Sequence, residues 1–263
     1  MMFDSHAHYD DRRFDDDRDS VLNYLFTAKG VENIINIGCD METSRSSIEL
    51  AEKYTQIYAS VGVHPHDAKS VPMNYISQLK KMLEHKKVVA IGEIGLDFHY
   101  DFSPRDVQRL IFKEQMQLAE KTGFPVIIHD REAHMECIDM TLSFPKVKGV
   151  FHSYSGSVES ARILLKAGWY ISITGVVTYK NAKTLPEVVA MIDEDRLMVE
   201  TDSPYLTPHP FRGQRNDSSY MEHTIKKIAE IRGVTPEHIE KITTENARRF
   251  FRIEEKNDHY LHC

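Results

Sequence analysis

Short apolar runs alternate with amphipathic segments along almost the whole chain. Runs that are apolar at consecutive positions predict strands buried on both faces, whereas apolar residues that recur every three or four positions predict helices. The predicted strands lie at 1–3, 33–38, 57–63, 88–92, 126–128, 149–151, 170–174 and 197–201. The predicted helices lie near 21–28, 42–54, 76–83, 104–121, 133–142, 158–167, 185–192, 220–232 and 236–249.

Eight strand–helix units in a chain of 263 residues predict an α/β fold of the (β/α)8 TIM-barrel type. A doubly wound open sheet is the alternative, because periodicity alone does not show that a sheet closes. No linker or shift in composition divides the chain. We therefore expect one domain over residues 1–263, with a charged, loose tail at 254–263.

Histidine and carboxylate side chains follow the predicted strands at their C-terminal ends. In a barrel these ends face one mouth, where active sites lie. Alternate residues of a strand point to the same side, so His6 and His8 should project together. An isolated pair of this kind is typical of a flexible surface, and the full set is what indicates a site. Its members are His6, His8, His64, Glu93, His129, His152 and Asp202.

The residue types in this set predict a metal centre. Without His64, the set offers six nitrogen and oxygen ligands, which exceed what one tetrahedral ion takes, so we expect two divalent ions bridged by Glu93. One ion would be completed by His6, His8 and Asp202, and the other by His129 and His152. Two such ions can hold a bridging hydroxide as the nucleophile, so metal-assisted hydrolysis is the expected reaction class. The chain has no Gly-x-Ser-x-Gly, P-loop or Gly-x-Gly-x-x-Gly motif that would indicate another chemistry.

Composition narrows the function classes further. The formal net charge of −7 argues against a protein that coats nucleic acid by bulk electrostatics, although it leaves room for a local basic pocket. The three cysteines are odd in number and lack Cys-x-x-Cys spacing, which argues against disulfides and thiolate metal sites and fits a reducing cytosol. Because the N-terminus does not read as a signal peptide and no run reaches the ~18 apolar residues of a membrane helix, we expect a cytoplasmic protein with no membrane partner.

Six motifs resemble those of a known family. They are, in order, 4–10, 62–66, 92–97, 125–131, 152–156 and 200–206. With these motifs the chain resembles the TatD-like metal-dependent deoxyribonucleases of the amidohydrolase superfamily. The resemblance implies a barrel of the metallo-dependent hydrolase type, DNA as substrate, cleavage at strand ends as an exonuclease, and no stable protein partner. It also implies two divalent ions (Mg, Mn or Zn) on the same six ligands: His6, His8, Glu93, His129, His152 and Asp202.

The expected roles follow from this chemistry. We assign catalysis to Asp202 and Glu93, with Asp202 orienting the nucleophile and accepting its proton. His64 and Arg131 are candidates for binding the substrate phosphate. The alternative for His64 is a structural turn residue before Pro65, and the alternative for Arg131 is a salt bridge at the start of a helix.

Four further side chains are weaker candidates. Arg212 and Arg215 offer charge for a phosphate, and Tyr154 either stacks on a base or belongs to the core. Asp97 either supports a ligand histidine or caps a loop.

Two other functions compete with a nuclease. A hydrolase of a small amide, lactone or phosphoester can use the same kind of site, but that version often bridges its metals through a carboxylated lysine on strand four. Glu93 occupies that position here, which favours the nuclease. The other competitor is a metal-binding protein without turnover, which has no chemical need for a complete ligand set.

Overall fold

The computed structural model describes residues 1–253, and at its centre lies an eight-stranded parallel sheet. Neighbouring strands pair in chain order from the first to the eighth, as expected for consecutive β–α units. The strands are β1 (Met2–Ala7), β2 (Val31–Ile37), β3 (Ile57–Val61), β4 (Val88–Asp97), β5 (Val126–Arg131), β6 (Gly149–Phe151), β7 (Tyr170–Ile173) and β8 (Leu197–Val199).

Backbone contacts between the first strand and the segment after the eighth close the sheet. Ala7 forms a parallel bridge with Ser203, whose carbonyl oxygen accepts a hydrogen bond from the His8 N–H at 2.7 Å. The Asp202 N–H donates to the carbonyl oxygen of His6 at 2.9 Å. The predicted (β/α)8 barrel is thereby confirmed, and the open doubly wound alternative is wrong.

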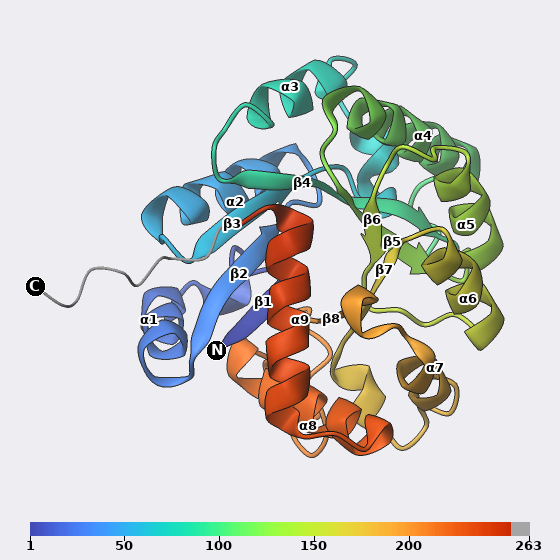
Figure 1. Cartoon of the computed structure of the whole chain (residues 1–263). Coiled ribbons are helices and arrows are strands. Elements are labelled where there is room, and N and C mark those ends of the chain that lie inside the picture. The colour runs from blue at the N-terminus through green and yellow to red at the C-terminus, as the bar shows by residue number, and fades with distance from the viewer. Residues whose placement is uncertain (254–263) are drawn as a thin grey trace, which may run out of the picture.

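Helices surround the barrel, and their boundaries agree with the sequence prediction to within a few residues (Figure 1). They are α1 (Arg18–Ala28), α2 (Met41–Lys53), α3 (Tyr75–Met82), α4 (Arg105–Thr122), α5 (His134–Leu142), α6 (Val158–Lys166), α7 (Leu185–Met191), α8 (Met221–Arg232) and α9 (Pro236–Phe251). The short 3-10 helices are η1 (Arg12–Phe14), η2 (Pro65–Ser70), η3 (Gly175–Thr178), η4 (Glu194–Arg196) and η5 (Ser218–Tyr220).

Three strands run further than the sequence predicted: β1, expected at 1–3, continues to Ala7, and β4 and β5 are extended together. We expected β4 to end at Glu93 and a loop to begin at Gly95, but β4 continues to Asp97. We expected β5 to end at His129, but it continues to Arg131. The two extensions pair with one another, Gly95 opposite His129 and Asp97 opposite Arg131, so strand pairing overrides the turn preference of the glycine and aspartate.

Helix α9 covers the N-terminal end of the barrel, across which it runs in Figure 1. Its Phe251 ring stacks on Phe3 of β1 with centroids 6.0 Å apart, and Phe250 packs on Tyr170 at the start of β7. The side chains inside the barrel form one apolar cluster with this helix: Phe3, Ile35, Ile37, Ala90, Ile127, Val150, Tyr170 and Met198 with Ala247, Phe250, Phe251 and Ile253. The opposite, C-terminal end therefore remains as the mouth.

Other sequence predictions concern the cysteines, the membrane and the tail. Cys39 and Cys137 are free thiols, as predicted. Among the described residues, no helix combines the length and the apolar character needed to span a bilayer. The predicted loose tail at 254–263 and Cys263 lie outside the described residues.

Candidate metal centre

The Glu93 carboxylate is the centre of the predicted ligand set. It lies in β4 at the barrel mouth and is 3% exposed. Its oxygens lie 2.7 Å from Nδ1 of His129 and 2.8 Å from Nε2 of His152. Nε2 of His6 is 3.4 Å away and Nε2 of His64 is 3.7 Å away. Four imidazole rings, two from β1 and β5 and two from the segments that follow β3 and β6, thus converge on one carboxylate.

The remaining two predicted ligands stand at the rim of this cluster. Asp202 follows β8 in a left-handed turn (φ +57°), and its Oδ1 lies 3.3 Å from Nε2 of His8 and 3.6 Å from Nε2 of His6. The rings of His6 and His8 have centroids 5.1 Å apart, so they lie on one side of β1 as the alternation predicts. Because the side chains of His8 and Asp202 are 14% and 15% exposed, the cluster opens to solvent at this point.

The protonation chemistry of His6 suits a metal ligand. Both of its ring nitrogens are buried, and neither has a hydrogen-bond partner. Burial, assisted by the neighbouring His152, lowers the pKa of His6, so the ring is neutral with a lone pair available. A neutral imidazole facing two carboxylates is the form that binds a divalent cation.

The buried carboxylates also favour positive charge in the cluster. Burial raises the pKa of Glu93, but the facing rings of His152, His64 and His6 outweigh burial and hold its pKa well below the usual range. Burial lowers the pKa of His152, but Glu93 and Glu200 outweigh it and raise that pKa well above its usual value. His152 is therefore protonated, and its positive charge takes the place of the charge that a divalent ion would supply. The set of nitrogen and oxygen donors fits such an ion.

Within residues 1–253, three combinations of side chains are found whose ligand atoms are close enough to share an ion, all within 4.8 Å of one another. They are His6 with His8 and Glu93, His6 with His152 and Asp202, and His64 with Glu93 and His129. The six predicted ligands are therefore brought together. Their division between two ions stays a prediction, since Nε2 of His152 lies 3.4 Å from Nδ1 of His129 but His152 also groups with His6 and Asp202.

Two further carboxylates, which the sequence did not indicate as ligands, lie behind two of the histidines. Oδ2 of Asp97 lies 3.1 Å from Nε2 of His129, which leaves Nδ1 of that ring facing Glu93. Oε1 of Glu200 lies 3.3 Å from Nδ1 of His152, which leaves Nε2 facing Glu93. A carboxylate behind a histidine fixes the ring and its tautomer in metal sites. Glu200 belongs to one of the motifs and lies two residues before Asp202, which is the signal that could have found it.

Asp97 performs both of the roles that the sequence left open. Its Oδ2 contacts His129 and also lies 2.9 Å from Nε2 of His66, a residue to which the sequence gave no role. Its Oδ1 accepts hydrogen bonds from the N–H groups of His99 and Tyr100 at 3.0 and 2.8 Å, which caps the loop after β4. One buried carboxylate therefore joins a site histidine to a loop at the mouth.

His64 has a donor facing the site. Its Nδ1 accepts a hydrogen bond from the N–H of His66 at 3.1 Å and caps η2, so the neutral ring carries its proton on Nε2. That N–H lies toward Glu93 and is poorly suited to bind a metal, but it can donate to an oxygen. His64 therefore has the turn role that the sequence left open, because it caps η2 through Nδ1. Its Nε2–H, on the side of the cluster, can still donate a hydrogen bond.

The other candidates separate clearly. Arg131 is exposed, lies with its guanidinium carbon 5.1 Å from the centroid of Tyr100, and forms no ion pair with any described residue. Arg215 instead pairs with Asp17 at 2.7 Å, and Arg212 packs over Tyr179. Tyr154 is 5% exposed and donates to the carbonyl oxygen of Ser157, so it belongs to the core and cannot stack on a base.

Cys39 is a neighbour of the cluster that the sequence did not point to. Its Sγ lies 3.9 Å from Nδ1 of His8 and 3.9 Å from Oε2 of Glu93. Burial raises the pKa of this thiol to about 12, so it stays protonated near neutral pH.

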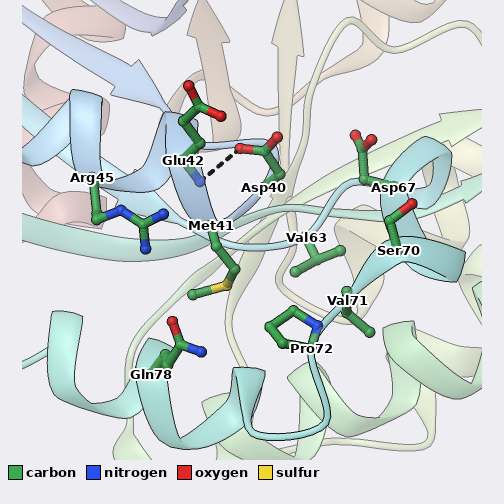
Figure 2. Close-up of a pocket in the computed structure, with 10 residues that line it drawn as sticks. All are labelled: Asp40, Met41, Glu42, Arg45, Val63, Asp67, Ser70, Val71, Pro72 and Gln78. Carbon is green, nitrogen blue, oxygen red and sulfur yellow. Dashed lines mark hydrogen bonds between the residues drawn. The ribbon is translucent and has the colours of Figure 1, made fainter.

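A separate hollow of about 300 Å³ lies between the start of α2 and the segment around η2 (Figure 2). Asp40, Asp67 and Ser70 bring oxygen atoms to it, and Figure 2 shows Val71 and Pro72 beside them. None of the six predicted ligands is among the residues that line it. The hollow is thus distinct from the cluster around Glu93.

The closed barrel and the cluster at its mouth define the class of metal-dependent hydrolases. A family model described as TatD related DNase matches residues 3–252, and the chain belongs to this family. The chain is 44% identical over 255 residues to "Uncharacterized metal-dependent hydrolase YabD" of Bacillus subtilis, covering 96% of this chain and 100% of that protein.

Two further comparisons extend this result. The chain is 35% identical to "3'-5' ssDNA/RNA exonuclease TatD" of Cronobacter sakazakii, with 95% of this chain and 97% of that protein covered. The crystal structure of the TatD homologue YjjV from Escherichia coli superposes with a TM-score of 0.90 at 29% identity, covering 96% of this chain and 98% of that one.

Proposed function

We propose that this metal-dependent hydrolase is an exonuclease that removes nucleotides from the 3′ end of single-stranded DNA. The observation that carries the proposal is the convergence of four imidazoles on Glu93, beside the rim carboxylate Asp202. The direction and the single-stranded substrate are supported by relatives named as 3'-5' ssDNA/RNA exonucleases.

The residues divide into ligands and groups that meet the substrate. We assign two divalent ions, Mg, Mn or Zn, to His6, His8, Glu93, His129, His152 and Asp202. Such ions lower the pKa of water and offset the charge of a phosphate under attack. The four imidazoles favour Zn or Mn over Mg, which prefers oxygen ligands.

Asp202 is the group that we assign to the proton of the attacking water. Its carboxylate stands at the open rim rather than in the buried part of the cluster. Burial raises its pKa, but the hydrogen bond with His8 and the neighbouring rings of His6 and His152 outweigh burial and lower the pKa below the usual value. Asp202 is therefore ionised near neutral pH, can orient a water molecule, and can accept its proton.

Arg131 and His64 are assigned to the phosphate. The guanidinium of Arg131 is exposed beside the mouth, and its planar fork matches two phosphate oxygens. The Nε2–H of His64 faces the cluster and can donate to a third oxygen.

The test is digestion of end-labelled single-stranded DNA by metal-stripped protein with Mg²⁺, Mn²⁺ or Zn²⁺ added back. We expect a ladder that shortens from the 3′ end, requires metal, and is absent with His129→Ala. His85→Ala is the matched control, because His85 precedes β4 at the opposite end of the barrel. No cleavage with any metal, from protein shown to hold its ions, would leave the small-molecule hydrolase as the better account.

A further inference from the structure

Two neighbouring aromatic rings are exposed beside the cluster. Tyr100 and Phe102 lie on the loop between β4 and α4, and their side chains are 47% and 55% exposed. Their rings are stacked with centroids 5.3 Å apart at an interplanar angle of 29°. Together with His66 they form a surface that we call the aromatic ridge. Exposing two large rings next to one another is unfavourable in water, and a loop that only connects two elements does not require them.

The ridge is tied to the metal centre through one side chain. The ring of His66 packs edge-on against Phe102 at 4.7 Å and against Tyr100 at 5.4 Å. Nε2 of His66 lies 2.9 Å from Asp97, whose same oxygen lies 3.1 Å from His129. A ligand that covers the ridge therefore lies next to the cluster.

The loop that carries the ridge is held in one conformation. The Asp97 carboxylate accepts from the N–H groups of His99 and Tyr100. Ser103 Oγ donates to the carbonyl oxygen of His66 at 2.7 Å, and Gln108 donates to the carbonyl oxygen of Ser103 at 2.8 Å. The rings are thus positioned before any ligand arrives, which reduces the entropy that binding loses.

Positive charge accompanies the rings. The guanidinium carbon of Arg131 lies 5.1 Å from the centroid of Tyr100, and Arg131 has no carboxylate partner among the residues that the structure describes. Stacked aromatic side chains beside an unpaired arginine are the combination by which proteins hold unpaired nucleobases and the adjoining phosphate.

We infer that the aromatic ridge is a base-stacking subsite for an unpaired nucleotide next to the scissile bond. The inference rests on the proposed nuclease function and deepens it, since it explains a requirement for single strands. A base within a duplex has both faces covered by its neighbours, whereas an unpaired base offers a face to Phe102. The ridge contributes no group to bond cleavage. It holds the strand while Arg131 holds the phosphate.

The test compares an intact single strand with the same strand carrying abasic sites near its 3′ end. Fluorescence anisotropy measures binding to metal-stripped protein, where cleavage does not interfere. We expect wild-type protein to bind the intact strand roughly tenfold more tightly, and Tyr100→Ala with Phe102→Ala to bind both strands equally. Phe102→Trp should preserve the preference. Tyr24→Ala on α1 is the control, because Tyr24 is also exposed, at 51%, but lies outside the mouth.

Hydrolysis by wild-type protein with metal restored separates the two proposals. If wild-type protein digests single strands but the double variant keeps the preference for the intact strand, the subsite is wrong and the nuclease stands. If wild-type protein digests no nucleic acid, both fall. If the double variant instead loses self-association in sedimentation with its strand preference unchanged, the ridge is an interface between copies of the chain and the inference is overturned.

Discussion

At the scale of single residues, the position of Glu93 explains most of the site. Its carboxylate is almost fully buried, yet it remains ionised because imidazole nitrogens face both of its oxygens. A buried charge of this kind is costly unless it is compensated, and a resident cation compensates it more completely than neutral rings do. Removing the charge while keeping the shape is therefore an informative change.

Glu93→Gln should lower the metal content of purified protein at least tenfold and kcat/KM on single-stranded DNA by roughly a hundredfold or more. The amide is nearly isosteric but supplies no negative charge to hold an ion. Elemental analysis and end-labelled digestion measure the two effects. Glu114→Gln is the control, since Glu114 lies on α4, is half-buried, and accepts a hydrogen bond from the hydroxyl of the buried Tyr75. Wild-type metal content in Glu93→Gln would remove Glu93 from the centre of the account.

A second carboxyl group, that of Asp4, makes stability depend on pH. Burial raises the pKa of Asp4 to about 6, even though Thr201 and Ser218 donate hydrogen bonds to it at 2.6 Å. In the unfolded chain this group titrates near pH ~4. Between these values the folded chain holds a proton that the unfolded chain has released. The contribution of Asp4 to the free energy of unfolding therefore falls as pH rises through this window and is level above it.

Urea unfolding from pH 4 to pH 7 tests this expectation on wild-type protein and Asp4→Asn side by side. The asparagine does not titrate, so subtracting its curve removes the effects of all other carboxyl groups. We expect the stability of wild-type protein relative to the variant to decrease between pH ~4 and ~6. A difference that is flat or increases over that range contradicts the raised pKa.

At the scale of elements, the pairing of β4 with β5 positions the site. The last residues of both strands run side by side, and Gly95 lies opposite His129 with a φ of +148°. A Cβ atom at Gly95 would lie 1.9 Å from the carbonyl oxygen of His129. Only glycine allows the strand that carries Glu93 to approach the strand that carries His129 this closely.

Gly95→Ala should destabilise the protein by about 2–5 kcal/mol and reduce metal content, because the clash pushes His129 away from Glu93. Gly213→Ala is the matched control: its φ of +90° is also left-handed, but a Cβ atom there meets no atom within 4 Å. We expect it to cost about 1 kcal/mol and leave the metal content unchanged. Denaturation and elemental analysis measure both variants, and equal effects would show that the close approach is unimportant.

The same two strands show where sequence patterns are sufficient and where they are not. Periodicity predicted eight strand–helix units, and the strand-end rule placed Glu93, His129 and Asp202 at one mouth. The extension of β4 to Asp97 was missed, because Gly95 and Asp97 are turn-forming types whose pairing partners on β5 lie more than thirty residues away in the chain. Local preference carries no information about such a pairing.

Ring orientation was also beyond the sequence. That His64 presents its Nε2–H to the cluster depends on a hydrogen bond from a backbone group of η2, and that Asp97 faces His129 depends on the length of β4. Both follow from the folded backbone rather than from residue type.

At the scale of the whole molecule, the residues that stabilise the barrel and the residues of the candidate site lie at opposite ends. Its N-terminal end is filled by Phe3 and the aromatic side chains of α9, whereas the polar cluster occupies the other end. A change beneath α9 should therefore affect folding without altering the mouth. The net charge of −7 also means that attraction for a nucleic acid must come from local groups such as Arg131 rather than from the molecule as a whole.

Phe251→Ala should lower the free energy of unfolding by about 3–5 kcal/mol while the metal content per folded molecule stays at the wild-type level. Phe251 is 2% exposed, so its loss leaves a cavity between α9 and β1. Leu110→Ala on α4, where the side chain is 55% exposed, should change stability by less than about 1 kcal/mol. Loss of metal in folded Phe251→Ala would show that the two ends of the barrel are coupled.

We propose that the mouth of the barrel holds metal ions around Glu93. Anomalous diffraction from crystals grown with Mn²⁺, measured at the manganese absorption edge, tests it most directly. We expect two peaks beside the Glu93 carboxylate, about 3.5–4 Å apart, within reach of His6, His8, His129, His152 and Asp202. A single peak there would contradict the two-ion assignment, and ordered Mn²⁺ with no peak near Glu93 would contradict the metal centre itself.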